Sequence, residues 1–141
     1  MDKQLNFLEQ KLREENLTCV VQKEQACFTS QERGIKPILL FLRQDPDCLR
    51  GASAADKVIG KAAALLFVYG GIRQVYAGVI STPALEVFQQ YGVVCEYGTL
   101  VDRIQNRKGD GLCPMETRAM TLTLPEEAYE VFRTLIFKEE S

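Results

Sequence analysis

The longest apolar pattern in the chain begins at Asp56 and reads DKVIGKAAALLFVY. After Lys61 this segment has no polar stripe, which is typical of a helix that is surrounded by other parts of the protein. Ser53, three residues before Asp56, fits a capping box, so the pattern predicts a helix from Ala54 to the stop signal Gly70-Gly71. We expect the rest of the fold to pack around this helix.

The segment before it predicts one helix, a hairpin and a second short helix. In residues 2–15, three leucines recur at the spacing of one helical face, at positions 5, 8 and 12. Two β-rich runs separated by a short polar turn follow, at 17–21 and 26–30. The apolar run at 38–42 fits either a helix or a buried strand, and we favour a short helix that ends before Asp45-Pro46.

The segment after it predicts a strand, a helix, a strand and a last helix, at 74–80, 82–92, 93–97 and from 125 onward. The first three indicate a parallel crossover unit, in which Thr82 caps the helix and Pro83 is its first residue. Residues 100–107 fit a short helix or irregular chain, and Met120–Leu124 fits an edge strand. The whole pattern predicts a single three-layer α/β domain over residues 1–141.

The composition excludes several classes of function. The net charge of −2 gives no basic surplus for binding nucleic acid, and no apolar stretch is long enough to span a membrane. Five scattered cysteines without a CxxC pair fit reduced thiols, so we expect a cytoplasmic protein. The chain has no histidine, which excludes His-based acid–base catalysis, Ser–His and Cys–His nucleophile pairs and His-containing zinc sites.

Helix beginnings carry the candidate binding residues, because their free N–H groups attract anions. Lys57 and Lys61 are four residues apart, so on a helix they share one face and suit an anionic ligand; simple solvation explains them about equally well. Asp56 is a second candidate, although capping alone accounts for it. Gly60 costs helix stability, which indicates close packing or, less often, close approach of a ligand. Ser81 opens another helix and is included as a ligand-binding residue.

Cys113 and Glu116 are the candidate catalytic residues, together with Lys61. If Cys113 is a helix N-cap, Pro114 occupies the first helical position and Glu116 the third. A helix N-terminus favours the reactive thiolate form of a cysteine, and Glu116 lies within reach as an acid or base. A helix start with an inert cysteine is the alternative. The preceding loop, from Asn106 to Gly111, has the glycines and cations of an anion-binding loop but also fits an exposed turn.

Three segments, DKVIGKAAALLFVYGG, VISTPALEVF and NRKGDGLCPME, resemble a small bacterial family of unknown function with the cytidine-deaminase-like fold. The resemblance covers about residues 5–120 and implies a mixed sheet of about five strands. It also implies a cleft where 56–61 faces 81–84, with 106–116 as a lid. Zinc deaminases carry a His-x-Glu or Cys-x-Glu and a Pro-Cys-x-x-Cys at two helix starts. Here those starts read GKAA and TPAL, which lack zinc ligands, so zinc-dependent deamination is not expected.

The sequence therefore predicts a domain that binds a small nucleotide-like or other anionic metabolite, without a cofactor and without zinc deaminase activity. One alternative is a metal-independent enzyme that uses Cys113, Glu116, Lys57 and Lys61. Another is a regulatory or interaction protein without catalysis, with a homodimer as one expected assembly. A thiol redox role is disfavoured because no resolving cysteine lies near Cys113 in the sequence.

Overall fold

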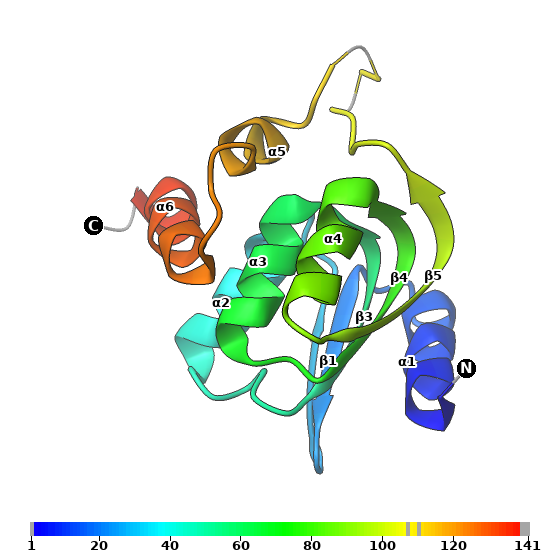
Figure 1. Cartoon of the computed structure of the whole chain (residues 1–141). Coiled ribbons are helices and arrows are strands. Elements are labelled where there is room, and N and C mark those ends of the chain that lie inside the picture. Colours follow the sequence, from blue (N-terminus) through cyan, green and yellow to red (C-terminus); the bar gives the residue numbers. More distant parts are fainter. Residues whose placement is uncertain (1, 107, 110, 139–141) are drawn as a thin grey trace.

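A computed structural model describes residues 2–106, 108–109 and 111–138. Its helices are α1 (Lys3–Glu14), α2 (Lys36–Gln44), α3 (Lys61–Gly70), α4 (Thr82–Gln90), α5 (Pro114–Ala119) and α6 (Pro125–Phe137). Its strands are β1 (Cys19–Lys23), β2 (Ala26–Ser30), β3 (Ser53–Ile59), β4 (Gln74–Ser81) and β5 (Val94–Val101). In the described part of the chain the strands form one five-stranded sheet in the order β2-β1-β3-β4-β5 (Figure 1).

The sheet is mixed. β1 pairs antiparallel with both β2 and β3, whereas β3, β4 and β5 run parallel to one another. The parallel strands are joined by α3 and α4, so the carboxyl ends of β3 and β4 both lead directly into helix N-termini. This arrangement confirms the expected α/β class, the number of strands and the parallel crossover.

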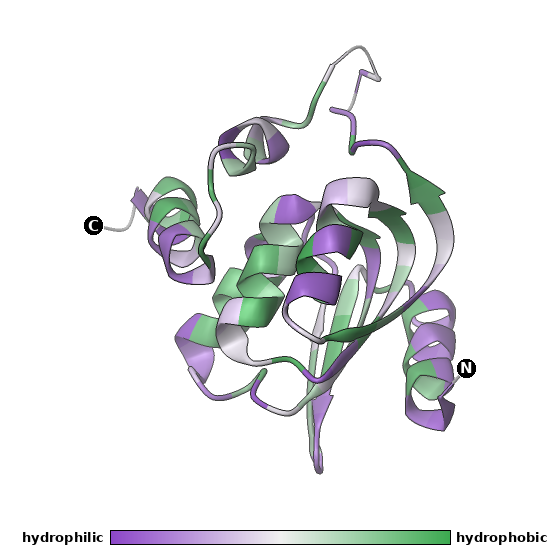
Figure 2. Cartoon of the chain, in the orientation of Figure 1, coloured by the Kyte–Doolittle hydropathy of each residue, from purple (hydrophilic) through white to green (hydrophobic). Residues whose placement is uncertain are grey.

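Helices cover the two faces of the sheet unequally (Figure 1). α1 packs alone on one face, over a small core of Leu8, Leu12, Leu17, Val20 and Ala55. α2, α3 and α4 lie on the other face, and α5 and α6 pack against α3 from outside. α3 is therefore enclosed by the sheet and four other helices, which explains why it is apolar almost all round (Figure 2). The expected central, buried helix is confirmed for residues 61–70.

The predicted start of this helix is wrong. Ser53–Ile59 is β3, a strand paired on both sides, and the helix begins after Gly60. Ser53 is not a cap: its hydroxyl donates to Gln4 Oε1 at 2.8 Å and accepts from Gln74 Nε2 at 2.8 Å. The short alanine-rich run misled the prediction, because alanine favours helix locally while the strand is imposed by its neighbours in the sheet.

Smaller differences occur elsewhere. The N-cap of α4 is Ser81 rather than Thr82, and β5 continues to Val101, after which residues 102–106 contain no helix. Met120–Leu124 is not an edge strand but a turn that ends at the N-cap of α6. The helix at 38–42 and the hairpin are confirmed, with Glu24 at φ +53° in the tight turn. None of the described helices is long and apolar enough to cross a bilayer.

Candidate functional site

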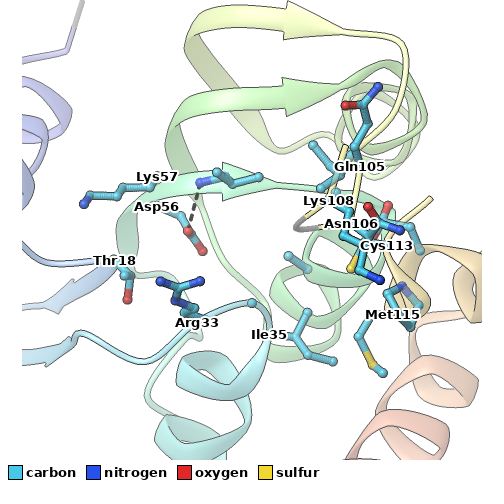
Figure 3. A pocket seen from close by; sticks show the side chains of 17 residues that line it. Thr18, Arg33, Ile35, Asp56, Lys57, Gln105, Asn106, Lys108, Cys113 and Met115 are labelled. Atoms are coloured by element: carbon cyan, nitrogen blue, oxygen red, sulfur yellow. Dashed lines mark hydrogen bonds between the residues drawn. The ribbon is translucent and has the colours of Figure 1, made fainter. Parts of the chain in front are cut away.

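A pocket of about 840 Å³ lies beyond the carboxyl end of β3 (Figure 3). Its walls come from the segment between β2 and α2, the end of β3, the start of α3, and the chain from Ile104 to the first turn of α5. In α/β folds this is the usual place for a ligand, because strand ends and helix N-termini meet there. Six of the predicted site residues border it: Asp56, Lys57, Gly60, Asn106, Cys113 and Glu116.

Glu116 supplies the N-terminal cap of α3. Its Oε1 accepts from the Lys61 amide at 2.6 Å and its Oε2 from the Ala62 amide at 3.0 Å. α3 has no capping side chain of its own, because its N-cap is Gly60. Two free N–H groups and the positive end of the helix dipole are thus satisfied by a carboxylate 54 to 55 residues away in sequence.

Gly60 is required by this cap. A Cβ at position 60 would overlap the Glu116 carboxylate, so any larger residue would push the carboxylate away from the α3 amides. The φ of −99° at Gly60 is accessible to every residue, so space and not backbone conformation selects glycine here. Gly60 is the N-cap of α3 and not, as predicted, inside a helix. Of the two reasons predicted for this glycine, close packing applies, and the group that packs against it is the Glu116 side chain.

Glu116 itself is nearly enclosed, with 8% of its surface exposed. Burial raises the pKa of Glu116, while the Ala62 and Lys61 amides and the Lys61 charge act in the opposite direction. Each carboxylate oxygen accepts one N–H from α3, so protonation of Glu116 as a catalytic base would weaken the cap. The catalytic role predicted for Glu116 stays a prediction, and its capping role is the one its contacts describe.

The two candidate lysines do not share a helical face. Lys57 is on β3, and its ammonium group points away from the pocket toward Asn16 Oδ1 at 3.5 Å (Figure 3). Lys61 is the first residue of α3, and its Nζ lies 3.5 Å from the Met120 carbonyl at the end of α5. The expectation of a paired cationic site is therefore wrong, because it assumed that residues 57 and 61 lie on one helix.

Asp56 is the most unusual group in the pocket. It faces the same side of the sheet as α3, is 4% exposed, and its Oδ1 accepts from the Val58 amide at 3.3 Å (Figure 3). Its Oδ2 is buried and has no hydrogen-bond partner in the described structure. Burial raises the pKa of Asp56 to about 7, although the Val58 and Lys57 amides and the neighbouring Cys19 thiol lower it. Asp56 therefore titrates near neutral pH.

The other predicted residues have more ordinary positions. Cys113 is the N-cap of α5, as expected, is half-buried and borders the pocket. Asn106 and Gly111 close a tight loop through the Asn106 amide and Gly111 carbonyl, but Gly111 does not border the pocket, and Arg107 and Asp110 lie outside the described residues. Ser81 lies outside the pocket and accepts from the Ala84 amide as the cap of α4.

Sequence reasoning missed Arg33, Thr18 and Gln105, which also line the pocket, whereas Lys108 belongs to the loop considered for anion binding. The exposed guanidinium of Arg33 lies on the Asp56 side of the pocket, and Lys108 lies with Cys113 on the other side (Figure 3). Only Gly34, directly after Arg33, hinted at a turn that brings this cation over the end of β3. In the described residues no group of three or more Cys, Asp or Glu side chains is placed to hold a metal ion.

The dependence of Gly60 on Glu116 predicts a strong coupling between the two positions. Gly60→Ala should destabilise the protein by about 1–3 kcal/mol, because the added methyl overlaps the buried carboxylate. In a Glu116→Ala background the same change should cost less than about 0.5 kcal/mol. Denaturant unfolding of the four proteins measures this cycle. Equal costs of Gly60→Ala in both backgrounds would show that the carboxylate is not the constraint.

The raised pKa of Asp56 predicts a characteristic pH dependence of stability. Its folded-state value of about 7 lies above the ordinary value of 3.8, so the folded protein holds the proton more tightly than the unfolded chain. This stabilisation is complete below pH 4 and is lost as the pH rises through 7. Asp56→Asn removes the ionisation, so relative to wild type it should gain stability between pH 4 and pH 8, by up to roughly 4 kcal/mol.

Thermal or denaturant unfolding of wild type and Asp56→Asn across this pH range measures the change. Asp47→Asn is the matched control, because Asp47 is exposed and its side chain pairs with Arg50 at the surface. Its stability difference from wild type should stay nearly constant. A constant difference for Asp56→Asn as well would mean that Asp56 ionises as easily in the folded protein as in the unfolded chain.

The fold and family were compared with known proteins. The chain is similar to a DUF1893 family protein of known structure, TM1506 from Thermotoga maritima, at 27% identity and a TM-score of 0.86, covering 95% of this chain and 91% of that one. A second solved structure is a diaminohydroxyphosphoribosylaminopyrimidine deaminase/5-amino-6-(5-phosphoribosylamino)uracil reductase from Thermotoga maritima. It is 17% identical, with a TM-score of 0.46, and the match covers 95% of this chain but 41% of that one.

No functionally curated protein matches the chain. The family model of TM1506, a domain of unknown function (DUF1893), matches residues 7–136. This range contains every element from the second half of α1 to the last turn of α6 and the whole of the pocket. The expected membership of a family of unknown function is therefore confirmed, and the chain belongs to the DUF1893 (TM1506) family.

Proposed function

We propose that this protein binds a small anionic metabolite, with nucleotide-like molecules as the leading class, in the pocket beyond β3. The observation that carries the proposal is a pocket that combines exposed cations with a buried, unpartnered carboxylate oxygen of Asp56. A volume of about 840 Å³ suits a ligand the size of a nucleotide. Apolar side chains such as Ile35 and Met115 provide surface against which a ring can pack.

Arg33 and Lys108 are the groups proposed to meet the negative charge of the ligand. Both side chains are exposed, and no ion pair joins either of them to a described acidic residue. A guanidinium offers a planar pair of donors that suits phosphate or carboxylate, whereas an ammonium acts as a point charge. These cations lie on different sides of the pocket, so a bound anion between them would connect its two walls.

Catalysis is not part of this proposal. Cys113 and Glu116 border the same pocket, as the enzyme alternative requires. However, both oxygens of Glu116 are engaged by α3, and the buried carboxyl of Asp56 is the group with a pKa near neutrality. The residues present support binding, and they do not include the ligand set on which zinc deaminases depend.

A thermal-shift panel of nucleotides, sugar phosphates and small carboxylates tests the proposal. At least one anion should stabilise the wild-type protein, by roughly 2.7 kcal/mol at a hundredfold excess over its Kd. Arg33→Gln should weaken that ligand about tenfold or more, because one charge-assisted contact is lost. Calorimetric titration of the two proteins gives the Kd values.

Arg50→Gln provides the matched control. It removes the same charge at the other end of the parallel strands, where Arg50 pairs with Asp47 at the surface at 3.4 Å. Its affinity for the ligand should equal that of wild type. Absence of any stabilising anion, or an equal loss of affinity in both variants, would refute binding at this pocket.

A further inference from the structure

Resting on the proposed function, we infer that the ligand is an aminated anion. It carries an amino or amidine group that enters the floor of the pocket beside Asp56, and a phosphate or carboxylate that stays at the rim with Arg33 and Lys108. The inference follows from the order of charges along the pocket, which is acidic in its buried part and basic where it opens to solvent.

In the described residues, one oxygen of Asp56 has no strong hydrogen-bond donor. Asp56 Oδ1 is occupied by the Val58 amide, while Oδ2 is buried and unpartnered. The Cys19 thiol beside Asp56 is a weak donor, and the single proton of the Thr18 hydroxyl is directed to the Ser30 and Glu32 carbonyls, at 3.0 and 2.5 Å. A buried acceptor without a donor is unfavourable, so a ligand that supplies an N–H gains affinity here.

Asp56 borders the pocket, so the contact lies at its wall. The terminal torsion of an aspartate is broad, so a partial rotation that turns the unpartnered oxygen further toward the pocket has a small cost. A compact amino or amidine group fits this contact better than a bulky one, because Asp56 is 4% exposed.

The start of α3 does not offer a place for the negative end of the ligand. Its first two amides already bind the Glu116 carboxylate at 2.6 and 3.0 Å. A phosphate there would have to displace that carboxylate, and otherwise would face both Glu116 and Asp56 at short range. Like charges in a buried site repel strongly, so the floor disfavours anions and favours cationic or N–H donor groups.

The exposed rim of the pocket, in contrast, favours a negatively charged group. Arg33 and Lys108 are exposed, while the third cationic residue that borders the pocket, Lys57, directs its ammonium group toward Asn16 and away from the pocket. A ligand with separated amino and anionic ends therefore has a single favourable orientation. Aminated nucleotides and amino sugar phosphates share this chemistry, and both are small enough for a pocket of about 840 Å³.

Two matched pairs of probes test the inference by isothermal titration calorimetry. GMP differs from IMP by an added amino group, and glucosamine 6-phosphate differs from glucose 6-phosphate by an amino group in place of a hydroxyl. In at least one pair the aminated member should bind wild type about tenfold or more tightly than its partner. The pair that shows this preference tells whether the ligand is an aminated nucleotide or an amino sugar phosphate.

Asp56→Asn should reduce that preference to less than about threefold, whereas Asp47→Asn, an exposed acid outside the pocket, should leave it unchanged. Equal or tighter binding of both unaminated members would overturn the inference without any variant. So would a preference that survives Asp56→Asn, or no binding of any of the four probes. In these cases the proposed function still stands if another anion of the thermal-shift panel binds in an Arg33-dependent way, and it fails only if none does.

Discussion

The contact between Glu116 and the start of α3 is the constraint on which the site depends. α3 is the most enclosed helix in the described structure, and its N-terminus opens toward the pocket without a capping side chain of its own. Unpaired amides at a buried helix end are costly, so an acceptor must come from elsewhere. Glu116 provides it and, by doing so, fixes α5 and the chain that leads to it as one wall of the pocket. The Lys61 ammonium near the Met120 carbonyl supports the same wall from its other end.

The Glu116 cap reverses the preference for anions that a free N-terminus of α3 would have. A free helix N-terminus attracts anions, and it was the reason for expecting a negative ligand group at residues 56–61. With Glu116 in place, the same position already carries a negative charge, which two amide N–H groups stabilise. The other buried acid of the pocket, Asp56, has one oxygen without a hydrogen-bond partner in the described structure, and burial raises its pKa to about 7. The positive charges of the pocket are left at its exposed rim.

The sequence predicts most elements because their signals are local. Leu5, Leu8 and Leu12 mark one face of α1, Gly70-Gly71 ends α3, and Cys113-Pro114 begins α5. The strand at 53–59 was not predicted, because it forms through pairing with β1 and β4, whereas its alanines favour a helix when considered alone. The β-branched Val58 and Ile59 before Gly60 were the available signal. A strand is also what a parallel unit requires directly before a buried crossover helix.

The difference between local and long-range signals also explains which parts of the site could be predicted. Asp56, Gly60, Cys113 and Glu116 are identified from the sequence as unusual, and they do border one pocket. The contacts between these residues cannot be predicted from the sequence. The Glu116–Gly60 contact joins residues more than fifty positions apart and depends on how α5 packs against α3. The misplaced helix start had a further consequence: it put Lys57 and Lys61 together and left Arg33 unconsidered. In the folded chain the lysines diverge, and a loop arginine lies on the Asp56 side of the pocket instead. The chemistry of the site therefore follows from a difference between two carboxylates: backbone amides donate to both oxygens of Glu116 but to only one oxygen of Asp56 in the described structure.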